Sequence, residues 1–409
     1  MSKSFAVSAL ADLAAAIRFL FKPAGRTRSV LAALFLALPI ASATILADPF
    51  QSAASQAPSE AEAPISAAEA RETAADFARL LEENYLFPEV ARRYAETLRS
   101  RAARGEYDNL GTRGALATAL TAHVQAVFPD GHLRIRPQSV AAGAQPQMGM
   151  APPPAQQGPV EPATPRPGGP IEEARWLAPG IAYIRFTLFP LDPAVTAAAA
   201  KFMNDHADAE TVIFDLRTHR GGGMGQAAAI LPYLFDREAI FLSQDTRAST
   251  GGGGNMPPWM RLASPSMEGV RTEEIFVRPH ASERRLFDAR VYVLTSGFTV
   301  SAAEAFAFGM KTTGRAMLIG ENTTGAGHYA PPGQRVNDRF SAFVPVGRAY
   351  DRRTGQGWEG TGVAPDVNVP PERALVEALV RSGIAPQEAE RLSASVHPQG
   401  PMRRTPPAG

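Results

Sequence analysis

The sequence predicts an α/β core preceded by a small α-helical domain. Apolar residues recur at helical spacing between residues 66 and 137. Beyond residue 171, short apolar runs alternate with helix-like stretches, a pattern typical of α/β proteins. A proline-rich stretch between them, residues 138–170, separates the two regions.

The composition is that of a globular protein, and it excludes several classes of partner and site. With 409 residues, 45% of them hydrophobic, it can fold as one large or two ordinary domains. Its 41 basic and 40 acidic residues create no strong field, so we expect no nucleic-acid partner. The chain has no cysteine, which excludes disulfides, thiolate metal sites and a cysteine nucleophile.

Residues 1–47 have the pattern of a secretory signal peptide. Lysine and arginine precede an apolar run over residues 30–40, and small residues follow it, which favours cleavage near Ala43 or Ala47. The run is short for a bilayer span. We therefore expect an exported protein, periplasmic or extracellular. The alternative is an uncleaved membrane anchor over residues 30–47.

The next two segments are predicted to be a tether and the helical domain. Residues 48–65 hold few large apolar groups, so we expect a disordered tether. In the domain over 66–137, a capping box of Ser66 and Glu69 begins the first helix, and Pro88 suits the start of a second. A third helix runs to residue 127, before a turn that contains a histidine.

The remaining divisions follow from composition and periodicity. Nine prolines and no hydrophobic period predict a disordered insertion over residues 138–170. The α/β core is expected over 171–392, with a flexible tail over 393–409. Its expected strands are Ile181–Leu188, Thr211–Leu216, Arg290–Thr295, Phe340–Val346 and Val363–Val369. Its expected helices are Ala194–Asp205, Gln226–Leu234, Ala302–Lys311 and one that begins at Pro371.

Two loops of the core could carry chemistry. The first, residues 215–223, follows a buried strand and ends in three glycines, whose N–H groups could bind an anion, although its spacing is not that of a nucleotide-binding loop. The second places Ser301 at the start of a helix. This serine can be an ordinary N-cap that forms a capping box with Glu304. It can also be a nucleophile, because the helix dipole stabilises negative charge that develops beside it.

A serine nucleophile needs a base, and the candidates are few. Lysine occurs only at positions 3, 22, 201 and 311. Lys311 lies about 15 Å along the helix from Ser301, and Lys201 has no companion motif. Histidine is therefore the expected base.

The segment around Ser301 is one of six motifs by which the chain resembles the S41 serine peptidases, between about Ala67 and Val369. The group includes tail-specific and carboxy-terminal processing proteases, tricorn protease and the interphotoreceptor retinoid-binding protein. The resemblance implies a crotonase-like ββα spiral for the core. The motifs are Asn84-Tyr85 with Phe87-Pro88-Glu89, Asp130-Gly131-His132-Leu133, Asp215-Leu216-Arg217 with Gly221-Gly222, Ser301-Ala302-Ala303-Glu304, Gly320-Glu321-Asn322-Thr323-Thr324-Gly325, and Trp358-Glu359-Gly360-Thr361-Gly362-Val363-Ala364-Pro365-Asp366.

The resemblance implies a catalytic set of Ser301, His132 and Glu359. The lysine of the processing-protease branch is absent, because its position falls in residues 325–327, Gly-Ala-Gly. This favours the tricorn-like and retinoid-binding-protein-like branch, which uses a histidine and a glutamate. The proline-rich insertion occupies the place of the PDZ domain of processing proteases.

Two departures from the family pattern leave alternatives open. Gly131 stands where tricorn has a serine that relays to the glutamate, so Glu359 could act through another group. His219 stands where asparagine is usual, and both His219 and His328 are alternative bases.

The mechanism that the resemblance implies needs no metal or cofactor. The oxyanion would be bound by the backbone N–H of Ala302 and of Gly222 or Gly221. We expect a peptide or protein substrate. An esterase would use the same triad, and a non-catalytic module that binds an apolar ligand or peptide is the alternative from another class.

Overall fold

The computed structural model describes residues 60–138, 160–250, 256–331 and 333–403. The expected signal peptide and most of the expected tether lie outside these ranges. Within them, no helix has both the length and the apolar content needed to cross a membrane.

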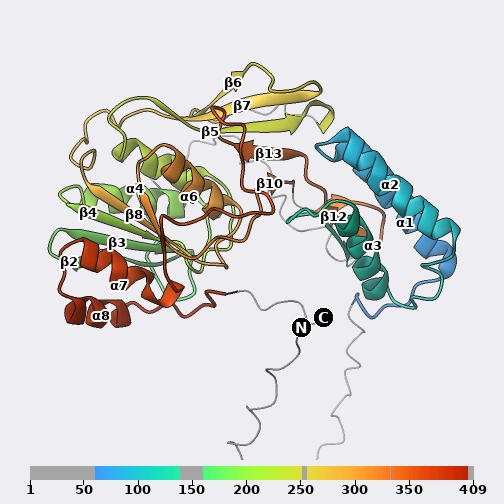
Figure 1. The fold of residues 1–409 in the computed structure, drawn as a ribbon, viewed down its shortest axis with the longest axis horizontal. Helices are drawn as coiled ribbons and strands as arrows, with labels where there is room; N and C mark the ends of the chain where they lie inside the picture. Colours follow the sequence, from blue (N-terminus) through green and yellow to red (C-terminus); the bar gives the residue numbers. More distant parts are fainter. Residues whose placement is uncertain (1–59, 139–159, 251–255, 332, 404–409) are drawn as a thin grey trace, which may run out of the picture. The chain divides into compact units, whose positions relative to one another are not determined.

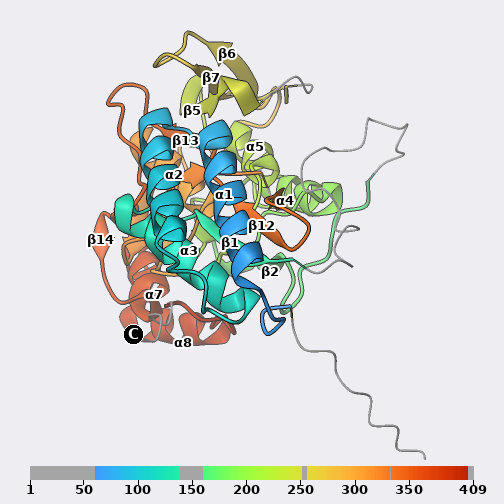
Figure 2. The same ribbon diagram turned by 90° about the vertical axis from the view of Figure 1, so that its right-hand side faces the viewer.

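The expected helical domain is built from three helices (Figure 2). They are α1 (Ala67–Asn84), α2 (Pro88–Ala103) and α3 (Arg113–Val127). The predicted capping box begins α1, where the N–H of Ser66 donates to Glu69 Oε2 at 2.9 Å and the N–H of Glu69 donates back to Ser66 Oγ at 3.3 Å. The helices pack through buried side chains, among them Phe77, Leu81, Tyr94, Leu98, Leu116 and Leu120.

A distant part of the chain completes this helical domain. Strand β1 (Arg134–Pro137) pairs antiparallel with β12 (Phe340–Phe343), which also pairs with β11 (Gln334–Arg335). Phe340 and Val344 are buried in the same apolar cluster as the three helices. A segment assigned to the core from sequence therefore packs with the N-terminal helices. Its strand β12 pairs with β1, the strand that follows the histidine turn.

The core contains a six-stranded sheet in the order β14-β9-β8-β4-β3-β2. Strands β2, β3, β4 and β8 of this sheet are labelled in Figure 1. Neighbouring strands are parallel except β2 and β3, which are antiparallel. The strands are β2 (Ile171–Ala178), β3 (Ile181–Phe186), β4 (Thr211–Asp215), β8 (Arg290–Thr295), β9 (Met317–Gly320) and β14 (Val367–Asn368). Strands β3, β4 and β8 match three of the strands predicted from apolar runs.

Helices cover both faces of this sheet because its strands alternate two sets of apolar side chains. Phe214 and Val293 point into the cluster with α4, α5 and α6, whereas Ile213 and Tyr292 pack with α7 and α8. The helices are α4 (Pro193–Asp205), α5 (Gly225–Ile230), α6 (Ala302–Thr312), α7 (Pro371–Arg381) and α8 (Pro386–Ser395), with short 3-10 helices at Leu231–Tyr233 and Ala248–Thr250.

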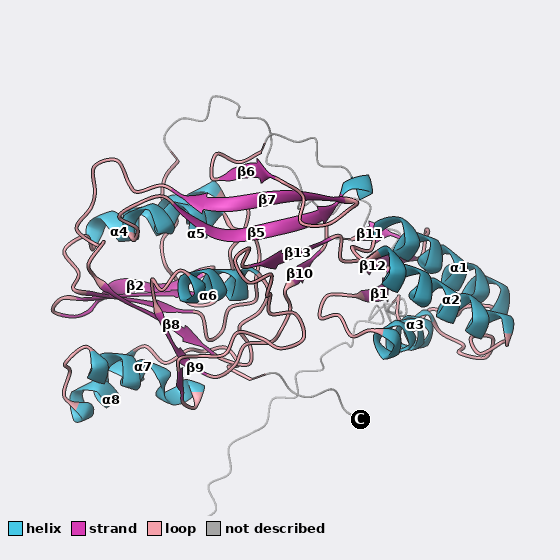
Figure 3. Cartoon of the chain, turned by 45° about the horizontal axis from the view of Figure 1, so that its top comes forward, coloured by secondary structure: helices cyan, strands magenta, loops and turns pink. Residues whose placement is uncertain are grey.

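A second, antiparallel sheet of five strands was not predicted (Figure 3). Its order is β10-β13-β5-β7-β6. The strands are β5 (Ala239–Arg247), β6 (Met260–Ala263), β7 (Val270–Val277), β10 (His328–Tyr329) and β13 (Gly347–Tyr350). Together with the first sheet, it gives the α/β core that the sequence predicts, and the predicted fold class is confirmed.

Two segments expected to be loose lie against the core where they are described. The N–H of Ala163 donates to the carbonyl of Ala194 at 2.9 Å, so the end of the proline-rich stretch contacts α4. Beyond α8, the carbonyl of Val396 accepts from the buried guanidinium of Arg185, and Arg403 pairs with Glu321 at 2.7 Å. The sequence could not predict these contacts, because the partners lie on distant strands and loops. Residues 139–159 of the expected insertion and residues 404–409 of the expected tail lie outside the described residues.

Candidate active site

Ser301 adopts a backbone conformation that is costly for a serine. Its φ is 59° and its ψ is −118°, and it is the one non-glycine residue with positive φ among the described residues. Such a conformation costs about 1–3 kcal/mol and persists only where its surroundings enforce it. It lies directly before α6, between the loop that follows β8 and the first turn of the helix.

Glu304 holds this turn in place from inside the core. Its buried carboxylate accepts hydrogen bonds from the N–H of Ser301 at 2.8 Å and from Thr323 Oγ1 at 2.6 Å. It also accepts from the N–H groups of Gly325 and Ala326 at 2.7 and 2.9 Å. Burial raises the pKa of Glu304, although these four donors oppose the rise. The carboxylate therefore ties the serine turn to the 323–326 loop.

Glu359 ties the histidine turn to the continuation of the same loop. Its Oε1 accepts from the N–H of Gly131 at 2.6 Å, next to His132 in the chain. Its Oε2 accepts from the N–H groups of Gly327 and His328 at 2.6 and 2.7 Å. The predicted acid thus contacts the backbone beside the predicted base.

Close packing explains the glycine at position 131. A Cβ there would lie 3.2 Å from both the Cα of Ala326 and the carbonyl oxygen of Gly325. That is tighter than ordinary van der Waals contact, so a serine side chain would push the loop away. With glycine at this position, it is the backbone N–H of residue 131 that donates to Glu359.

Asp130 shapes the turn at His132 and was missed as a site residue. Its buried Oδ1 accepts from the N–H groups of His132 and Leu133 at 3.0 and 3.2 Å. Its Oδ2 lies 2.7 Å from Nδ1 of His328 and accepts from the hydroxyl of Tyr85 at 2.9 Å. Burial works to raise the pKa of Asp130, but His328 and these donors outweigh it and lower the pKa. An aspartate two residues before a turn histidine is a typical Asx-turn signal that could have identified it.

The glycine loop passes directly against Ser301. A Cβ added to Gly221 would lie 3.0 Å from the Cβ of Ser301 and 3.5 Å from its Oγ. Gly221 and Gly222 have φ values of 96° and 125°, which favour glycine. The loop begins at the buried pair Asp215–Arg217, in which Oδ2 and Nη2 are 2.6 Å apart. The structure thus brings together this loop and Ser301, the two segments that the sequence singles out as candidates.

His219 is enclosed in this loop. Its Nδ1 accepts from the N–H of Gly221 at 3.0 Å, and its ring packs edge-on against Phe189 at 4.3 Å. Burial, with a smaller contribution from Arg220, lowers the pKa of His219 to about 3. The imidazole is therefore neutral at neutral pH, and the N–H of Gly221 already has an acceptor.

The carboxylates of Asp130 and Glu359, with His328, form a group whose ligand atoms all lie within 4.8 Å of one another. Spacing alone would allow a metal ion. However, both carboxylates already accept N–H or O–H donors, which a cation would have to displace. The three side chains are therefore arranged to form hydrogen bonds.

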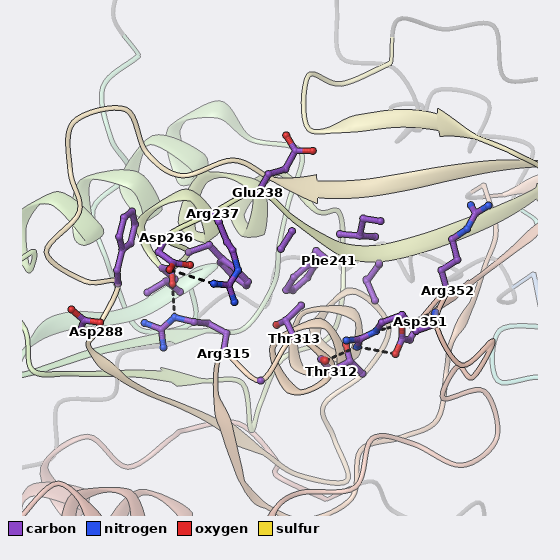
Figure 4. A pocket seen from close by; sticks show the side chains of 18 residues that line it. Asp236, Arg237, Glu238, Phe241, Asp288, Thr312, Thr313, Arg315, Asp351 and Arg352 are labelled. Carbon is purple, nitrogen blue, oxygen red and sulfur yellow. Dashed lines mark hydrogen bonds and ion pairs between the residues drawn. The ribbon is translucent and has the colours of Figure 1, made fainter.

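Two cavities of the described residues border the elements discussed above. A cavity of about 250 Å³ is lined by His328, Glu359 and Arg348, among others. A larger one of about 600 Å³ lies at the C-terminal end of α6, where Thr312, Thr313 and Arg315 contribute to its wall (Figure 4). Ser301 precedes the other end of α6, about 16 Å from Thr312. Of these two cavities, the smaller is the one lined by the predicted acid Glu359 and by the alternative base His328.

Two family models match the chain. The model of peptidase family S41 matches residues 180–369, and the model of the N-terminal domain of S41 peptidases in eukaryotic IRBP matches residues 59–164. The second covers the helical domain, and the first covers most of the core.

Solved structures are similar at low identity. The photosystem II D1 C-terminal processing protease is 16% identical, with 74% of this chain and 94% of that chain covered and a TM-score of 0.46. A candidate peptidase from Parabacteroides merdae is 16% identical, with 77% and 97% covered and a TM-score of 0.49. Tricorn protease is 15% identical, with 80% and 36% covered and a TM-score of 0.46.

The two family models cover adjoining parts of the chain, in the order of the helical domain and core described above, and they include the segments that carry Ser301, His132 and Glu359. The chain therefore belongs to peptidase family S41, and it is a serine-type peptidase.

Proposed function

We propose that this peptidase cleaves peptide bonds with Ser301 as nucleophile, His132 as general base and Glu359 as the acid that positions the histidine turn. The proposal is carried by the chain of hydrogen bonds through residues 323–328, which Glu304 joins to Ser301 and Glu359 joins to Gly131. Three segments far apart in the sequence are thereby linked around one loop.

In the proposed reaction, Ser301 Oγ attacks the carbonyl carbon of the scissile bond while His132 takes the hydroxyl proton. The C–N bond then breaks, the leaving amine receives that proton, and an acyl-enzyme remains. Water, deprotonated by His132, hydrolyses the ester and restores the serine.

The oxyanion is assigned to the backbone N–H groups of Ala302 and Gly222. Ala302 is the first residue of α6, so its N–H has no acceptor within the helix and lies at the positive end of the helix dipole. Gly222 belongs to the loop that passes against Ser301, whereas the N–H of Gly221 donates to His219. Each such donor is worth about 3 kcal/mol of transition-state stabilisation.

His328 is the second candidate for the base. Its buried ring has an aspartate 2.7 Å from Nδ1, which is the arrangement that orients an imidazole in serine hydrolases. Replacing each histidine separately by alanine distinguishes the two. Loss of turnover in the His328 variant, with turnover retained in the His132 variant, would transfer the role of base to His328.

We also infer that the protein is exported. This inference rests on the signal-peptide pattern of residues 1–47, which lie outside the described residues. N-terminal sequencing of protein recovered from the periplasm or medium tests it. A start near residue 44 or 48 is expected, and an intact N-terminus on the membrane would support the anchor instead.

Hydrolysis of unfolded casein and of quenched fluorescent peptides tests the function itself. Ser301→Ala is expected to lower kcat by at least about 10³-fold. Ser296→Ala is the matched control, because the hydroxyl of Ser296 lies in the same loop and donates to the carbonyl of Arg217 at 2.6 Å. Equal turnover in the Ser301 variant and the native protein would contradict the proposal.

A further inference from the structure

Arg348 lies in a row of ionisable side chains on one face of the second sheet. In the antiparallel register, Arg348 on β13 is directly opposite His328 on β10 and directly opposite Asp245 on β5. Directly opposed residues of an antiparallel pair share a face, with their Cβ atoms about 5 Å apart. The row extends from the buried centre of the sheet to the cavity beside Glu359.

One side of the Arg348 guanidinium is fixed. Its Nε donates to Asp245 Oδ2 at 2.9 Å, and its central carbon lies 4.6 Å from the centre of the Tyr350 ring. Asp245 is fully buried and also accepts from the hydroxyls of Ser266 and Thr272 at 2.6 and 2.7 Å. The guanidinium is therefore held in one orientation before any ligand binds.

The other side of the guanidinium is unused. No residue in the described ranges accepts a hydrogen bond from either terminal nitrogen of Arg348. Its side chain is 26% exposed and contributes to the wall of the 250 Å³ cavity, with Phe87, His328 and Glu359. Two parallel N–H donors on a rigid plane match the two oxygens of a carboxylate.

The carboxylates near the cavity do not compete for the two terminal nitrogens of Arg348. Glu359 is held by three backbone N–H groups, and Asp130 by His328, Tyr85 and two N–H groups. Asp245 contacts the Nε side of Arg348, away from the terminal nitrogens. Each negative charge thus has its own donors, which reduces its repulsion of an incoming anion.

We propose that Arg348 is a specificity-determining residue that binds a carboxylate of the peptide substrate. In identifying the ligand as substrate, this inference rests on the proposed function. The carboxylate can come from an acidic side chain or from the C-terminus of the peptide, since both present the same two oxygens.

Binding of four fluorescein-labelled octapeptides, measured by anisotropy on the intact Ser301→Ala protein, tests the proposal without requiring turnover. Two alanine peptides differ only in a C-terminal carboxylate or amide. Two others, both C-terminal amides, carry glutamate or glutamine at the fourth position. At least one carboxylate peptide is expected to bind 10-fold or more tightly than its neutral counterpart. Preference within the first pair identifies a chain terminus, and preference within the second an acidic side chain.

Variants of Arg348 test whether the preference for a carboxylate peptide depends on its planar guanidinium. Arg348→Gln is expected to reduce the carboxylate preference to less than 3-fold. Because that change leaves Asp245 buried without its cation, Arg348→Lys is the second variant, which keeps a positive charge but loses the planar fork. Arg352→Lys, four residues on and outside this cavity, should keep the preference.

Equal binding within both pairs by the Ser301→Ala protein would overturn the proposal, and so would a preference that survives in folded Arg348→Lys protein. Neither result bears on the nucleophile, which is tested by turnover of the native protein. Conversely, a carboxylate preference that depends on Arg348 would stand even if Ser301 were not the nucleophile, with the ligand then a peptide that is bound and not cleaved.

Discussion

Nδ1 of His328 lies 2.7 Å from Oδ2 of Asp130, across 198 residues of sequence. Asp130 belongs to the turn that carries His132, and His328 follows the loop bound by Glu304 and Glu359. Both side chains are buried. Together with the contacts of Glu359, this contact holds the histidine turn against the loop that Glu304 joins to Ser301.

Asp130→Ala should destabilise the protein substantially. It leaves a buried imidazole and the hydroxyl of Tyr85 without an acceptor, at a cost of about 3 kcal/mol in the free energy of unfolding. Chemical denaturation measures the change. Asp338→Ala is the control, because its exposed ion pair with Arg335 contributes little. Equal stability of the two variants would show that the contact with His328 does not stabilise the fold.

The buried His219 predicts a specific dependence of stability on pH. Its pKa is about 3 in the folded protein and about 6.5 when unfolded, so between these values only the unfolded chain takes up the proton. The contribution is complete above pH 6.5 and is lost as the pH falls, by about 1.4 kcal/mol per pH unit.

His219→Asn should remove this slope, since the asparagine oxygen can still accept from the N–H of Gly221. Urea denaturation at pH 7 and at pH 5.5 measures the difference. His280→Asn is the control, because His280 also accepts from a backbone N–H, that of Glu283 at 2.9 Å, but is only half-buried. An identical pH dependence in native and His219→Asn protein would show that folding does not change the pKa of His219.

Turnover should depend on a histidine and on no lysine. Lys201 pairs with Asp205 at 2.6 Å on the surface of α4, and Lys311 pairs with Asp366 at 3.0 Å. We expect His132→Ala to lower kcat/KM by 10²-fold or more. Lys201→Ala should change nothing, and an inactive Lys201→Ala protein with active His132→Ala would reverse the assignment.

Glu304→Gln should slow catalysis without weakening substrate binding. An amide can supply only one acceptor oxygen for four donors, so the serine turn and the 323–326 loop lose part of their hold on each other. A fall in kcat of about 10²-fold at unchanged KM is expected, because small displacements of a nucleophile are costly. A change in KM alone would indicate a role in binding substrate.

The sequence predicted those parts of the fold whose signals are local. Strands β3, β4 and β8 are continuous apolar runs, and α6 begins directly after a strand and a turn. Strand β5 was missed because it contains Gln244 and Asp245, which read as loop residues. Asp245 is tolerated there only because hydroxyls and Arg348 from other segments surround its carboxylate.

The same distinction applies to the site. Family membership and the serine-type peptidase class were predicted from motifs and are confirmed, whereas the roles of Ser301, His132 and Glu359 remain predictions. The pairing of Asp130 with His328 depends on where a two-residue strand meets β13, which no local pattern encodes. The N–H of Gly131 as the partner of Glu359 also required the fold, because only the packing against Ala326 explains the glycine.

Covalent labelling tests the central claim most directly. The native protein is treated with a serine-reactive fluorophosphonate, and the modified residue is located by peptide mass spectrometry, with Ser301→Ala as the unreactive control and His132→Ala as the slow one. We predict a single modification, at Ser301, and loss of peptidase activity in proportion to it. Modification of a different serine, or full inactivation with Ser301 unmodified, would contradict the assignment of the nucleophile.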